Sequence, residues 1–201
     1  MERLNIAVLV SGGGSNLQAI IDALQDELNQ TSIKCVIANR KEAFGLKRAE
    51  KYGIDAHYFG LGNFPDAKER TVHMLQLLKQ YKVDLIVLAG YLAILDEIFI
   101  EAFKGRIINI HPSLLPKYGG QGYYGAKVHE AVIAAGEKYS GATTHFVDNG
   151  VDTGRIIYQA QIEVKEGDTP ETLAQRVLRE EHRLIVKTVK DIQDGVVLIG
   201  N

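Results

Sequence analysis

The clearest chemical signal in the sequence is an asparagine and a histidine two residues apart, Asn109 and His111. They alternate with Ile108 and Ile110, and Pro112 follows directly. Residues two apart share one face of a strand, so we predict that the amide and the imidazole point the same way and that the proline ends the strand. An amide N–H can donate to a developing oxyanion, and an imidazole can move protons near neutral pH. The pattern favours catalysis, although a polar strand end bonded to its own loop has the same spacing.

A glycine-rich stretch, residues 11–17 (Ser-Gly-Gly-Gly-Ser-Asn-Leu), is the second candidate site. Consecutive glycines let backbone N–H groups gather around an anion, and the helix that follows adds positive partial charge. The stretch lacks the Gly-Lys-Ser/Thr ending of triphosphate loops, and Leu17 stands where the dinucleotide fingerprint has its third glycine. We therefore predict a monophosphate site, with a tight turn capped by Ser15 as the structural alternative.

Two carboxylates, Asp148 and Asp152, lie in a late turn, residues 147–154. An aspartate in such a turn usually bonds its own backbone, and this is the simplest role for Asp148. If Asp152 approaches His111, its charge would orient the imidazole and raise its pKa. The sequence does not show whether the two meet.

The other histidines give weaker signals. His57, His73 and His129 are predicted at the surface or in packing, His145 could line the cleft, and His182 lies in the middle of a predicted helix. No His, Cys or carboxylate pair has the spacing of a dedicated metal site, so we predict no metal.

The bulk composition describes an ordinary globular chain. It has 201 residues, a formal net charge of -2 and one cysteine, Cys35. The length suits one domain, the charge gives no global attraction to nucleic acid or anionic membranes, and a lone cysteine fits a reducing compartment. The N-terminus has no leader pattern, and no apolar run is long enough to span a bilayer. We expect a soluble, cytoplasmic protein whose partners are small molecules.

Short apolar runs alternate with segments of helical spacing over the first half of the chain. The predicted strands are residues 6–10, 35–38, 57–59, 85–88 and 107–110, and the predicted helices are residues 17–28, 44–52 and 67–81. This order predicts an α/β fold: a doubly wound, mostly parallel sheet with helices on both faces. Such sheets bind ligands beyond the carboxyl ends of their strands, where both candidate sites would lie.

The last third of the chain has a different pattern. We predict a helix over residues 126–135, an antiparallel strand pair over residues 142–147 and 155–164, and a long closing helix. That helix begins with Thr169 as its cap and Pro170 in its first turn, and it ends near Asp194. The irregular residues 117–125 are rich in glycine and tyrosine, so they form either an active-site lid or an ordinary surface loop.

Three motifs together resemble the phosphoribosylglycinamide formyltransferases of purine biosynthesis. They are Ser-Gly-Gly-Gly-Ser-Asn-Leu at residues 11–17, Asn-Ile-His-Pro-Ser-Leu-Leu-Pro at 109–116 and Val-Asp-Thr-Gly at 151–154. The resemblance covers essentially the whole chain. It implies formyl transfer from 10-formyltetrahydrofolate, as co-substrate, to the amine of glycinamide ribonucleotide. It also implies one domain over residues 1–201, with a phosphate-binding half at about 1–100 and a folate and catalytic half at about 85–201.

The resemblance also implies residue roles. Asn109 donates to the formyl oxygen, His111 is the protonated partner of the oxyanion and the acid toward the leaving folate nitrogen, and Asp152 holds it charged. The residues implied for ribonucleotide binding are Gly14, Ser15, Asn16 and Glu181, and those for the folate are Lys68, Leu92, Ala93, Ile94, Leu95, Asn109 and Asp148. Ala93 stands where many members have arginine, and the alignment at Lys68 is shifted by a gap.

Three alternatives share these residues. A formyltetrahydrofolate hydrolase or a methionyl-tRNA formyltransferase would use the same Asn, His and Asp, but those enzymes usually carry an additional domain for which 201 residues leave no room. A noncatalytic phosphosugar-binding protein would keep the glycine loop and use Asn109 and His111 only to bind. The sequence leaves open whether the protein is a monomer or a homodimer.

Overall fold

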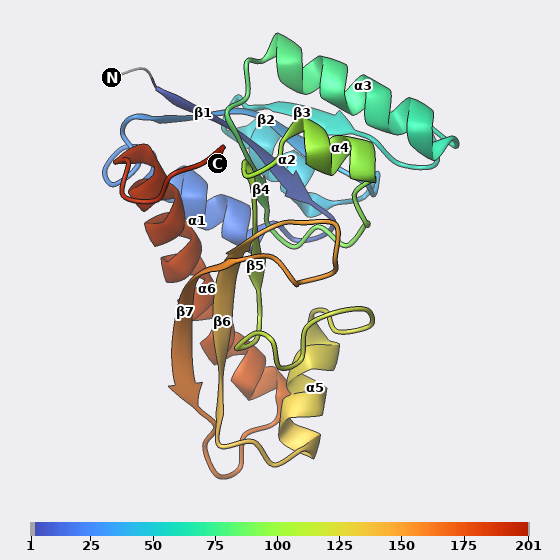
Figure 1. Cartoon of the computed structure of the whole chain (residues 1–201). Helices are drawn as coiled ribbons and strands as arrows, with labels where there is room; N and C mark the ends of the chain where they lie inside the picture. Colours follow the sequence, from blue (N-terminus) through green and yellow to red (C-terminus); the bar gives the residue numbers. More distant parts are fainter. Residues whose placement is uncertain (1–2, 201) are drawn as a thin grey trace.

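The fold is a seven-stranded sheet in the order β3-β2-β1-β4-β5-β6-β7, with helices on both faces (Figure 1). It was obtained as a computed structural model, which describes residues 3–200. The strands are β1 (Leu4–Val10), β2 (Thr31–Ala38), β3 (Asp55–Tyr58), β4 (Leu85–Leu88), β5 (Ile107–His111), β6 (Tyr139–Phe146) and β7 (Ile156–Glu163). The helices are α1 (Ser15–Ala23), α2 (Phe44–Lys51), α3 (Ala67–Gln80), α4 (Glu97–Ala102), α5 (Ala126–Ala134) and α6 (Pro170–Gln193).

The first five strands are parallel to one another, β6 runs in the opposite direction, and β7 returns to the direction of the first five. β6 pairs antiparallel with β5, so that His111 lies opposite Thr143 and Asn109 opposite His145. β7 then pairs antiparallel with β6. The predicted fold class, a mostly parallel doubly wound sheet with an antiparallel addition, is therefore confirmed.

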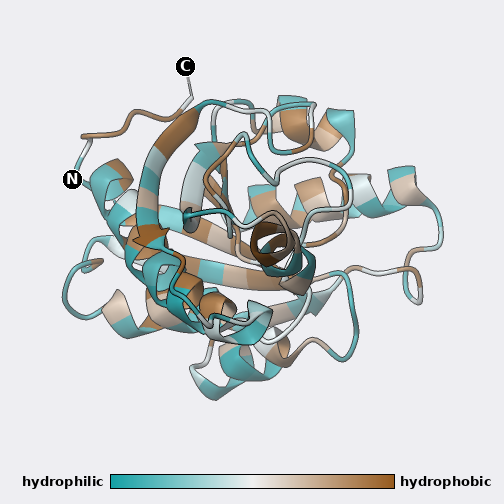
Figure 2. Cartoon of the chain, turned by 90° about the horizontal axis from the view of Figure 1, so that it is seen from below, coloured by the Kyte–Doolittle hydropathy of each residue, from teal (hydrophilic) through white to brown (hydrophobic). Residues whose placement is uncertain are grey.

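Two apolar cores fill the space between the sheet and its helices. On one face, Ile6, Val8 and Val10 of β1 pack in the core that contains residues of α1, α2, α5 and α6. On the other face, Ala7 and Leu9 pack in the core that contains residues of α3 and α4. Because both faces are covered, the parallel strands are continuous apolar runs. Viewed from below, brown apolar segments line the inside of the molecule and teal segments its outer surface (Figure 2).

The closing helix α6 follows the predicted caps closely. The Thr169 side chain accepts from the Thr172 N–H in a capping box, and Pro170 occupies the first turn. The helix is 24 residues long and packs against α1, α5, β6 and β7. It therefore joins the parallel part of the sheet to the antiparallel part.

Some predicted boundaries were wrong. α1 ends at Ala23 and not at Leu28, because the chain turns after the helix while the Leu28 N–H still bonds the Ala23 carbonyl and its side chain stays buried. Apolar side chains at helical spacing thus stay buried beyond the last residue of the helix. β3 begins at Asp55 and β6 at Tyr139, before their apolar residues. The six-residue helix α4 was not predicted.

Candidate active site

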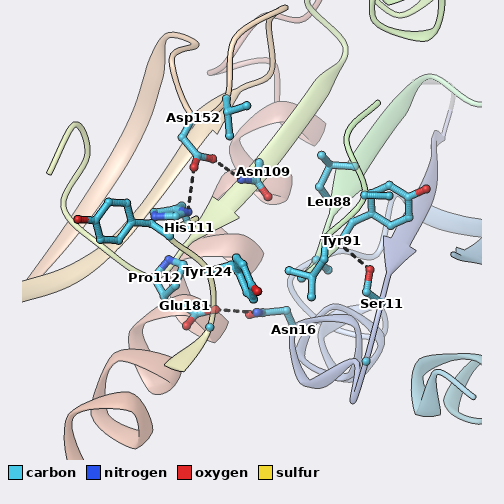
Figure 3. A pocket seen from close by; sticks show the side chains of 18 of the residues that line it. Ser11, Asn16, Leu88, Tyr91, Asn109, His111, Pro112, Tyr124, Asp152 and Glu181 are labelled. Carbon is cyan, nitrogen blue, oxygen red and sulfur yellow. Dashed lines mark hydrogen bonds and ion pairs between the residues drawn. The ribbon is translucent and has the colours of Figure 1, made fainter. Parts of the chain in front are cut away.

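A cavity of about 780 Å³ opens at the carboxyl ends of the parallel strands. Its wall is formed by residues 11–16, 88–95, 109, 111–112, 120–126, 145 and 147–152, with further side chains that include Arg40, His129 and Glu181. Figure 3 shows Asn109, His111 and Asp152 on one side of this cavity and Asn16 with Glu181 on another. A cavity of this size lies within the range of small-molecule sites.

The glycine loop presents N–H groups to the cavity because its carbonyls are bound elsewhere. The Gly12 carbonyl accepts from the Gly45 N–H at 3.0 Å, and the Gly13 carbonyl accepts from Arg48 Nε at 2.8 Å. Gly14 has a φ of 69°, and a Cβ there would lie 2.8 Å from the Gly45 Cα, so this position requires glycine. In the described chain, the N–H groups of Gly12, Gly13 and Gly14 have no acceptor. They precede α1 directly, so the loop is suited to bind an anion.

Asn16 and Glu181 meet beside this loop although 165 residues separate them. Asn16 Nδ2 donates to Glu181 Oε2 at 2.9 Å, and both residues are buried. Burial raises the pKa of the Glu181 carboxyl, and the Asn16 hydrogen bond opposes the rise. Asn16 Oδ1 is buried without a partner in the described chain, so a donor group on a ligand could satisfy it.

Arg40 was not selected from the sequence. It follows β2, and it is the one lysine or arginine in the cavity wall formed by the described residues. Its side chain is exposed. The available signal was its position just beyond the carboxyl end of a parallel strand, on the same edge of the sheet as the glycine loop.

The predicted catalytic residues come together at the end of β5. His111 Nδ1 lies 3.5 Å from Asp152 Oδ2, and Asn109 Nδ2 donates to Asp152 Oδ1 at 3.4 Å (Figure 3). Asp152 has a φ of 59° and also accepts from the Gly120 N–H at 3.0 Å. His111 Nε2 lies 2.7 Å from the Tyr118 carbonyl. The imidazole is therefore flanked by two acceptors.

Burial decides the pKa of His111. Burial lowers this pKa below its ordinary value, and His145 lowers it further. The Asp152 charge and the Tyr118 carbonyl raise it, but they do not offset the burial. The expected net rise was therefore wrong, although the effect of Asp152 has the predicted sign. Burial also disfavours the charged form of Asp152, but His145, His111 and the Gly120 N–H outweigh it and lower the pKa of this carboxyl.

The residues predicted for the folate divide into two groups. Leu92, Ala93, Ile94, Leu95 and Asp148 line the cavity. Asp148 also has the predicted turn role, because its Oδ1 accepts from the Gly150 N–H at 3.1 Å and from Thr153 Oγ1 at 2.6 Å. Lys68 lies on α3 and is exposed, and it is not part of the cavity wall.

The remaining histidines differ in their positions. His145 lines the cavity, as the sequence suggested, and contacts both Asn109 and Asp152. His129 is buried and also lines the cavity, so packing is only part of its setting. His57 is half-buried on β3, and His73 is exposed on α3. His182 neighbours Glu181 on α6 but lies outside the cavity wall.

The chain was then compared with known proteins. A formyl transferase family profile matches residues 4–189. The chain belongs to the formyl transferase family. It is 42% identical to a chloroplastic phosphoribosylglycinamide formyltransferase of Arabidopsis thaliana, over 99% of this chain and 71% of that protein. It is 36% identical to the phosphoribosylglycinamide formyltransferase of Escherichia coli, over 96% of this chain and 88% of that protein.

A solved structure agrees with this membership. The phosphoribosylglycinamide formyltransferase of Coxiella burnetii superposes with a TM-score of 0.91 at 40% identity, covering 100% of this chain and 92% of that one. The resemblance to the phosphoribosylglycinamide formyltransferases is thus confirmed within the formyl transferase family. The relatives support this transferase and not the hydrolase or tRNA alternatives.

Two searches for other features gave negative results. Over residues 3–200, no three His, Cys, Asp or Glu side chains gather as they would around a metal ion. None of the helices in that range is both long and apolar enough to cross a membrane.

Proposed function

We propose that this formyl transferase moves the formyl group of 10-formyltetrahydrofolate to the primary amine of glycinamide ribonucleotide, releasing formylglycinamide ribonucleotide and tetrahydrofolate in purine biosynthesis. One observation supports the proposal above all others. The glycine loop and the group of Asn109, His111 and Asp152 open into the same cavity of about 780 Å³. A phosphate at the loop and a formyl group at the strand end would therefore occupy one continuous space.

The amine attacks the formyl carbon and forms a tetrahedral species with an oxyanion and a cationic nitrogen. Asn109 donates an N–H to the oxyanion, and protonated His111 pairs with the same charge. When the C–N bond to the folate breaks, His111 gives its proton to the leaving nitrogen, and Asp152 assists loss of the amine proton through water. The product then carries the formyl group on its amide nitrogen.

The ribonucleotide phosphate is assigned to the N–H groups around Gly14 and Ser15, with Arg40 as the neighbouring cation. Asn16 and Glu181 bind the polar groups of the same substrate. The folate is assigned to residues 92–95 and to Asp148, and Lys68 remains a predicted contact. The wall at residues 92–95 is mostly apolar, which suits a flat heterocycle. We keep one domain, a monomer or homodimer, and a cytoplasmic location as expectations.

Both ring nitrogens of His111 face acceptors of the protein itself, Asp152 and the Tyr118 carbonyl. His111 can therefore give a proton to substrate only if one of these contacts opens. Tyr118 lies in the glycine-rich loop, residues 117–125, whose members Gly120 and Gly122 have positive φ. We include opening of the Tyr118 contact in the proposal. Proteolysis of this loop should slow when both substrates are bound, and an unchanged cleavage rate would contradict a lid.

The decisive experiment follows deformylation of 10-formyl-5,8-dideazafolate, a donor analogue, by absorbance. Purified protein is incubated with the analogue in the presence and absence of glycinamide ribonucleotide. Deformylation that requires the ribonucleotide supports the transferase. Equal release without it would indicate a hydrolase, and no release in either case would support the binding-protein alternative.

A further inference from the structure

His145 lies within hydrogen-bond distance of the amide to which the proposed function assigns the oxyanion. Its Nε2 is 3.1 Å from Asn109 Nδ2, and its Nδ1 is 2.8 Å from the Phe146 carbonyl. The carbonyl can only accept, so Nδ1 carries the proton. In a neutral ring, Nε2 is then a lone pair that accepts from the Asn109 amide. His145 itself is only 2% exposed, so its ring has a fixed setting.

Asp152 shows independently which end of the Asn109 amide faces inward. Its Oδ1 lies 3.4 Å from the same Asn109 atom, and an ionised carboxylate can only accept. That Asn109 atom is therefore the amide nitrogen, which agrees with the assignment from His145. The His145 contact is the shorter of the two and holds the amide more firmly.

The two acceptors hold the amide nitrogen unequally. Asp152 Oδ1 and His145 Nε2 are 3.6 Å apart, so with Asn109 Nδ2 they form a nearly equilateral triangle. The two acceptors are separated by about 67° as seen from the nitrogen, whereas the two N–H bonds of a planar amide diverge by about 120°, so each N–H can point within about 27° of one acceptor. The Asp152 contact is the longer of the two, so the N–H on that side is the one that a formyl oxygen in the cavity can take over.

We propose that His145 is a positioning residue for formyl transfer: its Nε2 holds the Asn109 amide so that one N–H can be given to the formyl oxygen. The inference rests on the proposed function, because it gives His145 a role only if Asn109 is the oxyanion donor. Without the Nε2 acceptor, the amide could rotate and present its carbonyl to the developing oxyanion, which would be repulsive. The effect belongs to the transition state, so it should reduce kcat with little change in KM.

Two substitutions separate this role from packing. Asparagine at 145 can still donate to the Phe146 carbonyl but does not reach the Nε2 position, whereas the glutamine amide oxygen can. We expect His145→Asn to lower kcat about 10- to 100-fold and His145→Gln to remain within a few-fold of the unchanged protein. In an Asn109→Ala background, His145→Asn should have almost no further effect. Thermal unfolding and ribonucleotide affinity are measured for every variant, to separate the effect on kcat from effects on folding and on substrate binding.

The outcomes distinguish the inference from the function on which it rests. If Asn109→Ala lowers kcat while His145→Asn does not, or if His145→Gln loses as much as His145→Asn, the inference is overturned and the function stands. If Asn109→Ala keeps full activity, the proposed role of Asn109 fails and this inference fails with it. A measurement on the unchanged protein is independent of folding defects: ¹⁵N NMR at pH 8 should show His145 protonated on Nδ1, and an Nε2–H tautomer would refute the proposal.

Discussion

At the residue scale, the chemistry depends on an opposition between burial and charge at His111. Burial lowers the pKa of this imidazole, and Asp152 with the Tyr118 carbonyl limits the fall. The proposed acid role of His111 therefore depends on the two groups that offset its burial, Asp152 and the Tyr118 carbonyl. The neighbours of His111 and Asp152 therefore shift the pKa of each side chain.

The first prediction concerns Asp152→Asn. Removing the carboxylate takes away the charge that raises the His111 pKa, so this pKa should fall further below its ordinary value. If protonated His111 is the acid, kcat/KM falls as the pH rises through the His111 pKa, and this fall should move to lower pH in the variant. We expect turnover at pH 7.5 to drop by about 10²- to 10⁴-fold, the range of acid-base catalysis. The pH profile and NMR titration of His111 check both effects.

Asp26→Asn is the matched control for charge removal, since Asp26 is exposed in the turn after α1. It should leave the pH profile unchanged. An Asp152→Asn profile with the same midpoint as the unchanged protein would contradict the assigned role of the carboxylate.

A second prediction at this scale concerns Arg40→Gln. The side chain is the one lysine or arginine in the cavity wall over the described residues, and the phosphate it would face carries up to two negative charges. We expect the KM for the ribonucleotide to rise about tenfold, with kcat and the folate KM little changed. Steady-state kinetics measure the split, and raised ionic strength should reduce the difference between the two proteins. An unchanged ribonucleotide KM would remove Arg40 from the site.

At the scale of elements, the sequence predicted what depends on local pattern. Apolar runs such as Ile6 to Val10 gave the parallel strands, and Thr169 with Pro170 gave the start of α6. α4 was missed because six residues are too few to show a helical period, although Asp96 caps it by accepting from the Ile98 N–H at 2.9 Å. Helices and strands were therefore predicted where their pattern was long enough to show a period, and a cap alone was not sufficient.

The shared direction of the candidate catalytic side chains Asn109 and His111 could be predicted, because strand alternation fixes it. The positions of the backbone groups around them could not be predicted. The Tyr118 carbonyl, which sits against His111, and the Gly120 N–H, which binds Asp152, have no side-chain signature. Burial of His111, which sets the direction of its pKa, also depends on how the loop packs. These properties arise from the tertiary arrangement alone.

Ser11 joins three elements and provides the prediction at this scale. Its hydroxyl donates to Asn39 Oδ1 at 2.6 Å and accepts from the Leu92 N–H at 2.7 Å, so it connects the ends of β1 and β2 with the proposed folate segment. Ser11→Ala removes the acceptor of the part-buried Leu92 N–H and should reduce the free energy of unfolding by about 1 kcal/mol. The folate KM should rise more than kcat falls.

Denaturant unfolding and steady-state kinetics measure these two effects of Ser11→Ala. Ser140→Ala is the matched control, because Ser140 is also buried but its hydroxyl has no partner in the described chain. The control should be neutral or slightly stabilising. Equal effects of the two substitutions would show that the Ser11 bonds do not fix the folate segment.

At the scale of the whole molecule, the cavity exists because distant parts of the chain close around the sheet edge. Its wall combines the loop after β1 with residues of α6, and the bond between Asn16 and Glu181 connects them across 165 residues. α6 also packs on α1, α5 and β6. A buried carboxylate at this junction costs stability, which the proposed ribonucleotide site would explain.

Glu181→Gln tests that cost. The raised pKa of Glu181 means that the folded protein binds the proton more tightly than the unfolded chain, so this residue adds stability as the pH falls through the folded pKa and costs stability above it. Glutamine keeps an acceptor for Asn16 but carries no charge. We expect the variant to melt about 2–4 °C higher at pH 8, which corresponds to about 1 kcal/mol in a chain of this size, with the difference narrowing toward pH 5. Ribonucleotide affinity should fall about tenfold.

Glu180→Gln is the matched control, because it removes only a surface ion pair with Arg183. It should change neither the melting temperature nor the ribonucleotide affinity appreciably. A Glu181→Gln protein that is less stable at pH 8 would show that the carboxylate supports the fold instead of the site.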